Sequence, residues 1–327
     1  MIGTFKKNLS LIKRFIYFFI RETIGLFIIL FGGVYIAKYI LKNKPYYMVF
    51  NYHNFSKYNN YSINRGNILD TGYIKNFEKQ LIFFKKHFTF LYPSEFFEKG
   101  ASNGINILLT FDDGYKDNYQ FAFPLLKKHN LKCIFFIVSD FIGSSDYLLH
   151  DKIRFLIQNS LIDERYDEIP TNLYKGKKNY KLEDINYIDK KFNNNRPSNH
   201  LMMSLDQVLS ISKSKFQIGN HTKSHKALSF LNFREQYNEI SKCQDFIASN
   251  TETNSSISIA YPNGLFNKDT IQVLDKINID YGFTIIPGFN NLSTNHLKLK
   301  RIGINVSDSI GTIMVKIFLE IIKMTFK

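Results

Sequence analysis

The stretch INILLTFDDGY, residues 105–115, decides how this chain is interpreted. Its first seven residues are mostly apolar, as in a buried β-strand, and the run ends in Asp112, Asp113 and Gly114. Adjacent side chains on a strand point to opposite faces, so the two carboxylates can share one task only if the chain turns there. Gly114 supplies such a turn. Carboxylates at the C-terminal end of a barrel strand lie where barrel active sites are built.

Outward from this stretch, strand-like apolar runs alternate with helical patterns. We expect strands at 46–52, 88–92, 105–111, 133–138, 216–219, 257–261, 281–285 and 299–304. We expect helices at 73–87, 118–129, 205–212, 234–248 and 268–277. This alternation gives parallel strands joined by helical crossovers, as a doubly wound sheet or a barrel. About eight strands over roughly 260 residues favour the barrel. The predicted fold class is therefore α/β, a distorted (β/α) barrel of about seven or eight strands.

The composition fits a folded domain and narrows its partners. The 327 residues carry a formal net charge of +15, but the lysines are scattered and form no basic stripe, so we expect no nucleic-acid binding. Cys133 and Cys243 are too few for a disulfide framework, and their separation matches no metal-binding spacing. The length allows one large α/β domain with extensions at its ends.

Apolar segments at both ends of the chain point to a membrane. Residues 15–41 contain an uncharged stretch from Thr23 to Ala37 flanked by basic residues. We expect residues 1–44 to be a membrane-associated region whose hydrophobic helix either spans the bilayer as a signal-anchor or lies on its surface. Residues 306–327 are predicted to form an amphipathic helix, which either closes the domain core or makes a second membrane contact.

The domain between these ends is expected to span residues 45–305. One stretch breaks its rhythm, because residues 163–200 are polar and rich in lysine and asparagine. This segment is predicted to be a long insertion or a partly mobile loop.

A second polar cluster follows another apolar run. In FQIGNHTKSHKALS, residues 216–229, His221 and His225 lie four apart in a chain that has eight histidines. One helical turn would bring both imidazoles to one face, close enough to hold a single ion. With one Asp added, the set becomes an open metal site that leaves a position for water. Four further histidines are expected to be exposed: His87, His129, His150 and His200.

Together these segments resemble the polysaccharide deacetylase family, the NodB-homology or carbohydrate esterase 4 proteins. Residues 110–114 (TFDDG) and 221–225 (HTKSH) match its two main signatures. Residues 47–53 (YMVFNYH) are similar to the opening strand of its exopolysaccharide- and lipopolysaccharide-linked branch. Residues 260–264 (AYPNG) and 300–304 (KRIGI) resemble the third motif and the closing strand. The resemblance covers about residues 45–305.

The resemblance implies a role for each matching residue. Asp113, His221 and His225 would ligate a divalent metal, with zinc expected and cobalt, nickel or iron as alternatives. Asp112 would be the general base on the metal-bound water. A backbone N–H at Asn263 would stabilise the oxyanion together with the metal.

Three positions depart from the family pattern. Most members take the general acid from a late Leu-x-His motif, which has no counterpart after Arg301. We therefore expect the acid to be His53, as in the branch with this opening strand, with a structural histidine capping the strand as the alternative. Ala260 stands where the family has the Arg that orients the base, and Asn263 stands where it has Tyr. Arg301 is expected to reach Asp112 from the last strand, unless it is a surface arginine closing the barrel.

Together with the apolar ends of the chain, the resemblance implies a membrane-associated enzyme of the bacterial cell envelope, on a side of the membrane that is left open. The enzyme would remove acetyl groups from N-acetylated sugars of a surface polysaccharide or a lipid-linked glycan. Its expected partners are this glycan and a membrane surface, and the oligomeric state is not predicted. Two alternatives remain, namely a deformylase or O-deacetylase of a related glycan and a non-catalytic glycan-binding descendant.

Overall fold

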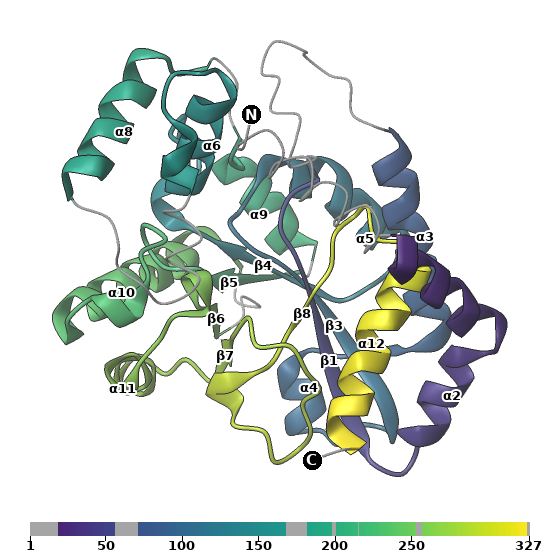
Figure 1. Cartoon of the computed structure of the whole chain (residues 1–327). Helices are drawn as coiled ribbons and strands as arrows, with labels where there is room; N and C mark the ends of the chain where they lie inside the picture. The colour runs from purple at the N-terminus through teal and green to yellow at the C-terminus, as the bar shows by residue number, and fades with distance from the viewer. Residues whose placement is uncertain are drawn as a thin grey trace.

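The computed structural model describes residues 19–55, 71–167, 182–197, 201–214, 216–252 and 257–325. Its centre is a parallel sheet in the order β7-β6-β5-β4-β3-β1-β8 (Figure 1). The strands on this path are β1 (Pro45–Tyr52), β3 (Gly104–Phe111), β4 (Cys133–Ile137), β5 (Gln217–Asn220), β6 (Ser258–Ala260), β7 (Tyr281–Phe283) and β8 (Ile302–Gly303). The short β2 (Thr89–Phe90) pairs with β3 off this path. Every expected strand is present, with shifted ends.

The sheet curls into a distorted barrel, which confirms the predicted fold class. The Leu299 N–H donates to the Gly282 carbonyl oxygen at 2.8 Å, and the Thr284 N–H donates to the Leu299 carbonyl oxygen at 2.8 Å. Three residues later, Ile302 of β8 pairs with Phe50 of β1. The last strand segment, residues 299–303, therefore lies between β7 and β1.

Alternate positions along the strands fill two apolar layers, as the period of two requires. Tyr47 and Val49 of β1 belong to an inner cluster, which Phe96 of α4 (Pro93–Phe97) also joins. Met48 and Phe50 belong to the larger cluster between the sheet and its covering helices. Buried on both faces, the strands appear in the sequence as nearly continuous apolar runs.

The five expected helical segments are present. They form α3 (Thr71–His87), a π-helical turn (Asn118–Ala122) followed by α5 (Phe123–His129), α9 (Leu205–Lys213), α10 (Phe233–Asn250) and α11 (Lys268–Lys276). Side chains of Ser204, Asn232 and Asn267 accept backbone N–H groups at the starts of α9, α10 and α11. These caps satisfy N–H groups that have no partner within the helix.

Part of the predicted insertion or mobile loop, residues 163–200, is helical. Residues 182–194 form α8, which packs on α6 (Leu149–Gln158) beyond the strand ends (Figure 1). Ile188 and Phe192 lie one helical turn apart and join the apolar cluster of α6. The polar composition of the segment hides this short apolar stripe. Residues 168–181 and 198–200 lie outside the described residues.

The N-terminal region does not form the expected single helix. Helix Phe19–Leu30 and α2 (Gly33–Ile40) are inclined by 75° to each other. The break is at Gly32, whose φ of 70° is left-handed and suits a residue without Cβ. Among the described helices none alone is long and apolar enough to cross a bilayer, and this bent pair meets the length and composition criteria only when combined. Residues 1–18 lie outside the described residues.

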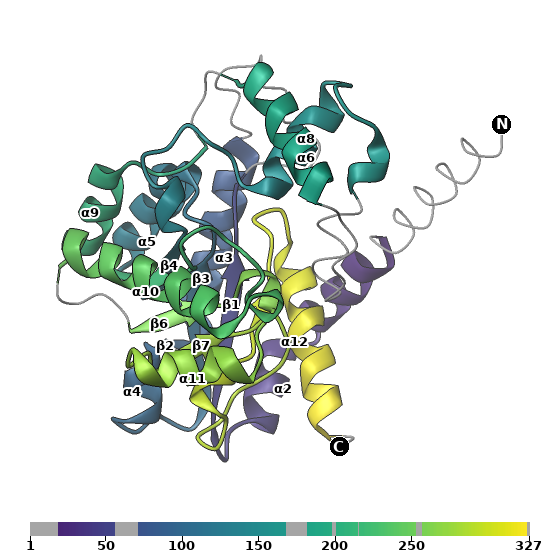
Figure 2. The same cartoon turned by 90° about the vertical axis from the view of Figure 1, so that its left-hand side faces the viewer.

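The predicted C-terminal helix is present as α12 (Ile310–Thr325). Its residues Ile313, Met314 and Ile317 belong to the main core, as expected of a helix that closes the domain. Helix Phe19–Leu30 and α12 approach closely at Gly25 and Gly311. A Cβ on Gly25 would lie only 2.4 Å from the Gly311 carbonyl carbon, so the approach requires a glycine there. Figure 2 shows α2 and α12 side by side.

Candidate metal centre

The chain turns sharply where β3 ends, as the sequence requires. Asp113 has a φ of 76° and Gly114 a φ of 78°, both in the left-handed region. A Cβ on Gly114 would lie 3.3 Å from Ile142 Cδ1, so this position favours glycine. A left-handed backbone conformation costs free energy at a residue other than glycine, and such residues are enriched at functional sites. Through this turn Asp112 and Asp113 both lie, almost fully buried, at one end of the barrel.

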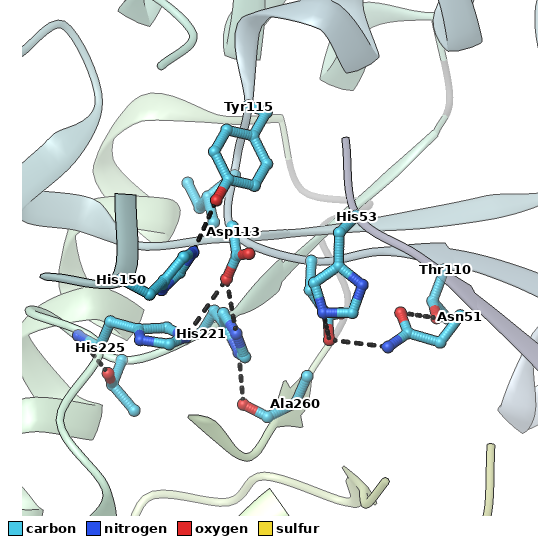
Figure 3. A network of polar contacts seen from close by, with 12 residues as sticks. Asn51, His53, Thr110, Asp113, Tyr115, His150, His221, His225 and Ala260 are labelled. Carbon is cyan, nitrogen blue, oxygen red and sulfur yellow. Dashed lines mark hydrogen bonds and ion pairs between the residues drawn. The ribbon is translucent and has the colours of Figure 1, made fainter. Parts of the chain in front are cut away.

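Three side chains from two distant stretches meet at one point (Figure 3). Asp113 Oδ1 lies 3.3 Å from His221 Nε2 and 3.2 Å from His225 Nε2. Ligands about 2.0–2.1 Å from a tetrahedral zinc ion are separated by about 3.4 Å. The donor atoms therefore have the spacing of three ligands around one ion. Two imidazoles and a carboxylate suit a divalent metal with one open position.

The two histidines converge for a reason other than the expected helical turn. Residues 221–227, which follow β5, form a loop, and Thr222 and His225 have left-handed φ values of 67° and 61°. Thr222 Oγ1 accepts the His225 N–H at 3.0 Å. The Ser224 N–H donates to Glu239 Oε2 of α10 at 2.8 Å. The loop therefore turns His225 back toward Asp113, a path that the spacing of two histidines cannot reveal.

A backbone carbonyl orients the ring of His221. His221 Nδ1 lies 2.7 Å from the Ala260 carbonyl oxygen and donates to it, so a neutral ring turns the Nε2 lone pair toward Asp113. Two lone pairs facing each other at 3.3 Å repel unless a proton or a cation lies between them. Burial lowers the pKa of His221. The hydrogen bond with Asp113 and the charges of the nearby carboxylates raise it by more, so the net shift of this pKa is upward.

The other two members of the triad shift in the opposite direction. Burial alone would raise the pKa of Asp113, but the hydrogen bonds from His221 and His225 hold it well below its usual range. Burial lowers the pKa of His225, which the contact with Asp113 only partly offsets. Without a metal, these shifts favour an ionised Asp113 carboxylate, a second proton on the His221 ring and a neutral His225 ring.

Metal affinity should depend on pH in one direction. A metal must displace the proton from His221, so binding is weakest below the raised pKa of this residue, tightens as the pH rises through it and then levels off. The number of protons released per metal bound should fall as the pH rises through the pKa of His221. Calorimetric titration in buffers of different ionisation enthalpy measures this number. Affinity that does not change between mildly acidic and neutral pH would contradict the protonation scheme.

A second buried cluster surrounds Asp112. Arg301 donates from Nη1 to Oδ1 at 2.7 Å and from Nη2 to Oδ2 at 2.8 Å, a bidentate pair. Arg301 Nε also donates to the Thr284 carbonyl oxygen at 2.8 Å. The alternative of a surface arginine is wrong, because Arg301 is 1% exposed. Burial raises the pKa of Asp112, but the charge of Arg301 outweighs it and keeps the carboxyl ionised.

The remaining expected site residues lie at the same end of the barrel. His53 follows β1, is 39% exposed, and places its Nε2 4.0 Å from Asp112 Oδ2. Asn263 lies in the turn after β6, three residues beyond Ala260, with a left-handed φ of 56°. Within the described parts of the chain, its N–H meets no backbone acceptor. The structure thus brings His53 and Arg301 to Asp112 and places Asn263 in the turn after Ala260, whose carbonyl oxygen bonds His221, while their roles stay predictions.

The sequence analysis missed Asn51. Its Nδ2 donates to Asp112 Oδ2 at 3.2 Å, and its Oδ1 accepts from Thr110 Oγ1 at 3.2 Å (Figure 3). A signal was available, because Asn51 and His53 are two apart and share one face of an extended chain. Asn51 also pairs with Thr110 in the parallel register.

The expectation of exposed histidines is wrong for His87, His129 and His150, which are half-buried. His200 lies outside the described residues. His150, at the start of α6, lies 2.8 Å through Nε2 from Tyr115 Oη, and its ring meets that of His225 (Figure 3). A single histidine in a polar segment gave no sign of this position, because its partners lie 35 and 75 residues away in the sequence.

Comparison with known proteins identifies related chains. The sequence profile of the family described as Polysaccharide deacetylase matches residues 99–282. The chain is 26% identical over 215 residues to a poly-β-1,6-N-acetyl-D-glucosamine N-deacetylase of Staphylococcus epidermidis, covering 64% of this chain and 60% of that protein. It is 22% identical over 199 residues to YxkH of Bacillus subtilis, which is named as a polysaccharide deacetylase, covering 61% of this chain and 51% of YxkH. The chain thus spans between half and three fifths of these relatives.

A solved structure shares the fold. The Streptococcus pyogenes deacetylase PplD, in complex with acetate, superposes with a TM-score of 0.56 at 19% identity. The superposition covers 83% of this chain and 98% of PplD. At this identity the likeness establishes the barrel fold alone.

Proposed function

We propose that this chain, which belongs to the polysaccharide deacetylase family, is a metal-dependent hydrolase that removes acetyl groups from N-acetylated sugars of a surface polysaccharide or a lipid-linked glycan. The observation that carries the proposal is the convergence of Asp113, His221 and His225 beside the buried carboxylate of Asp112. The name of the Staphylococcus epidermidis relative supports an N-acetylglucosamine polymer as the class of substrate.

A divalent metal on the triad would polarise the acetamide carbonyl and favour ionisation of water. The residues of the chain handle the protons. Asp112, kept ionised by Arg301, accepts the proton of the attacking water. His53, partly exposed beside Asp112, donates a proton to the departing sugar nitrogen. The N–H of Asn263 donates to the substrate oxygen that gains negative charge.

Released acetate is the direct test of this proposal. Full-length protein loaded with zinc, cobalt, nickel or iron is incubated with β-1,6- and β-1,4-linked N-acetylglucosamine oligomers and with N-formylated and O-acetylated analogues. We expect acetate from an N-acetylated oligomer, and none after the change Asp113→Ala. Release only from the formylated or O-acetylated compounds would replace the proposal with the first alternative. Binding of glycan without any release would replace it with the second.

We also propose that the chain works at the membrane of the bacterial cell envelope. Support comes from helix Phe19–Leu30, α2 and the turn between them, where several large apolar side chains are 65–74% exposed: Phe19, Leu30, Phe31, Tyr35 and Tyr39. Lys38, Lys42 and Lys44 are exposed beside this apolar surface. An apolar face flanked by lysines suits a bilayer that contains anionic lipid.

Vesicle flotation tests the membrane proposal. The full-length protein should float with vesicles of phosphatidylglycerol and phosphatidylethanolamine, and the double change Leu30→Ser and Phe31→Ser should reduce the bound fraction by about tenfold or more, because two exposed apolar side chains are lost. The matched control replaces Ile82 and Ile257, which are 50% and 46% exposed elsewhere, with Ser. Equal flotation of both double variants, or no flotation of the unchanged protein, would exclude this surface as the membrane contact.

A further inference from the structure

We propose that His150, Tyr115 and Asp151 form a network that positions the metal ligand His225. Tyr115 follows the Asp112-Asp113-Gly114 turn, whereas His150 and Asp151 lie in the first turn of α6. The inference rests on the proposed function in one respect, because it presupposes that the triad binds a metal. His150 acts on His225 and not on the substrate, so it is a positioning residue.

The two histidine ligands are held in different ways. His221 has a hydrogen-bonded partner for its second ring nitrogen, the Ala260 carbonyl oxygen at 2.7 Å. In the described part of the chain, His225 has no such partner for its side chain beyond Asp113. Instead its ring lies between two other imidazoles, with centroids 4.9 Å from His221 and 5.7 Å from His150. The ring of His150 meets it at 60°, edge to face (Figure 3).

Metal-bound histidines are almost always oriented by an outer partner, and loss of that partner costs metal affinity. For His225 the His150 ring takes the place of a hydrogen-bonding partner. The contact limits rotation of His225 about its side-chain bonds, so Nε2 stays aimed at the point that it shares with Asp113 and His221.

His150 can orient another ring only if its own ring is fixed, and hydrogen bonds fix it. Tyr115 Oη donates to Asp151 Oδ2 at 2.8 Å and lies 2.8 Å from His150 Nε2. A phenol has one hydrogen, and an ionised carboxylate only accepts. With that hydrogen on the bond to Asp151, the hydrogen between Tyr115 and His150 comes from His150 Nε2. This sets both the tautomer and the plane of the His150 ring.

The network is buried and anchored in the arm formed by α6 and α8. Tyr115 and Asp151 are 3% and 1% exposed, so their hydrogen bond is shielded from competing water. Lys152, the next residue, donates to Asp189 Oδ1 of α8 at 2.9 Å. Phe155 and Phe192 pack the two helices together. The arm, which begins beyond β4, thereby reaches a metal ligand on the loop after β5.

Cobalt binding tests the network without any measurement of activity. Co²⁺ affinity is determined by competition with a chelator, and the visible spectrum of the bound Co²⁺ reports ligand geometry. We expect His150→Ala and Tyr115→Phe to lower the affinity by about 10–100-fold and to change the spectrum. His150→Phe keeps a ring against His225 and should recover part of the affinity. The matched control is His129→Ala, which removes a half-buried histidine at the end of α5 that is bonded to Glu78 of α3.

The outcomes separate this inference from the proposed function. If the unchanged protein and the control bind Co²⁺, and Tyr115→Phe and His150→Ala bind it with the same affinity and spectrum, the network does not position His225. If the unchanged protein itself binds no Co²⁺, the metal-dependent hydrolase is wrong and the inference falls with it. Should His150→Ala fail to fold, Tyr115→Phe decides alone, because it removes a single oxygen atom.

Discussion

Asp112→Asn should abolish almost all release of acetate while the triad still binds metal. An amide cannot accept the proton of water, and loss of a general base typically costs about 10²–10⁴-fold in rate. Asp112 is not among the three side chains that gather around the candidate metal position, so metal affinity should stay within about threefold of the unchanged protein. Acetate release per bound metal is the quantity to compare.

The neighbouring change Asp113→Asn is the matched control for this prediction. It removes one charge from the adjacent residue, but it should act by lowering metal affinity, because Asp113 Oδ1 faces both imidazoles. Saturating metal should therefore restore part of the activity of Asp113→Asn and none of that of Asp112→Asn. An Asp112→Asn protein that keeps a tenth or more of the activity would show that another group takes the proton.

The barrel was predictable because its strands are buried on both faces. Runs such as residues 105–111 and 133–138 are apolar throughout, which distinguishes them from the helical segments between them. The meeting of Asp113 with His221 was predictable because both lie just after strands, and parallel strands bring their ends to one edge. The choice of Asp113 over Asp112 as a ligand came from the resemblance to the family. Both signals are local in sequence.

Other features depended on long-range or backbone detail. The spacing of His221 and His225 fits a helical turn as well as the observed loop, and only the left-handed φ values at Thr222 and His225 distinguish them. The break at Gly32 was missed because the apolar run continues through it. The contact between His150 and His225 depends on the packing of the α6 and α8 arm, and the spacing of residues along the sequence does not encode such packing.

Arg301 lies between these cases. The sequence places Arg301 on the last strand. Its contact with Asp112 was predicted because Ala260 stands where the family has the arginine that orients the base. The contact requires the last strand to lie beside β1, which brings residues 112 and 301 together across 189 positions of sequence. Closure of the barrel brings Arg301 to Asp112. The stability of the fold and the ionisation of Asp112 therefore depend on each other.

Arg301→Met should lower the free energy of unfolding by about 3–5 kcal/mol at neutral pH, because it leaves the buried Asp112 charge without its partner. Urea unfolding at several pH values measures this loss. In the unchanged protein, the Asp112 pKa is lowered, so the pair stabilises the fold above the pKa of an unfolded Asp and less as the pH falls through the folded value. In the variant, burial is left to raise that pKa, so acid favours its fold. The difference in free energy of unfolding between the unchanged protein and Arg301→Met should therefore become smaller as the pH falls.

Two further variants show whether the loss comes from the buried charge. Adding Asp112→Leu to Arg301→Met removes the unpaired carboxylate and should recover most of the stability, since an apolar pair often replaces a buried ion pair without loss. Lys128→Met breaks an ion pair of similar length, 2.8 Å to Glu78, with a lysine side chain that is 64% exposed, and should cost at most about 1 kcal/mol. If Arg301→Met costs no more than Lys128→Met, Asp112 is either solvated or protonated in the folded protein. Such an Asp112 would not be the pre-ionised base on which hydrolysis depends.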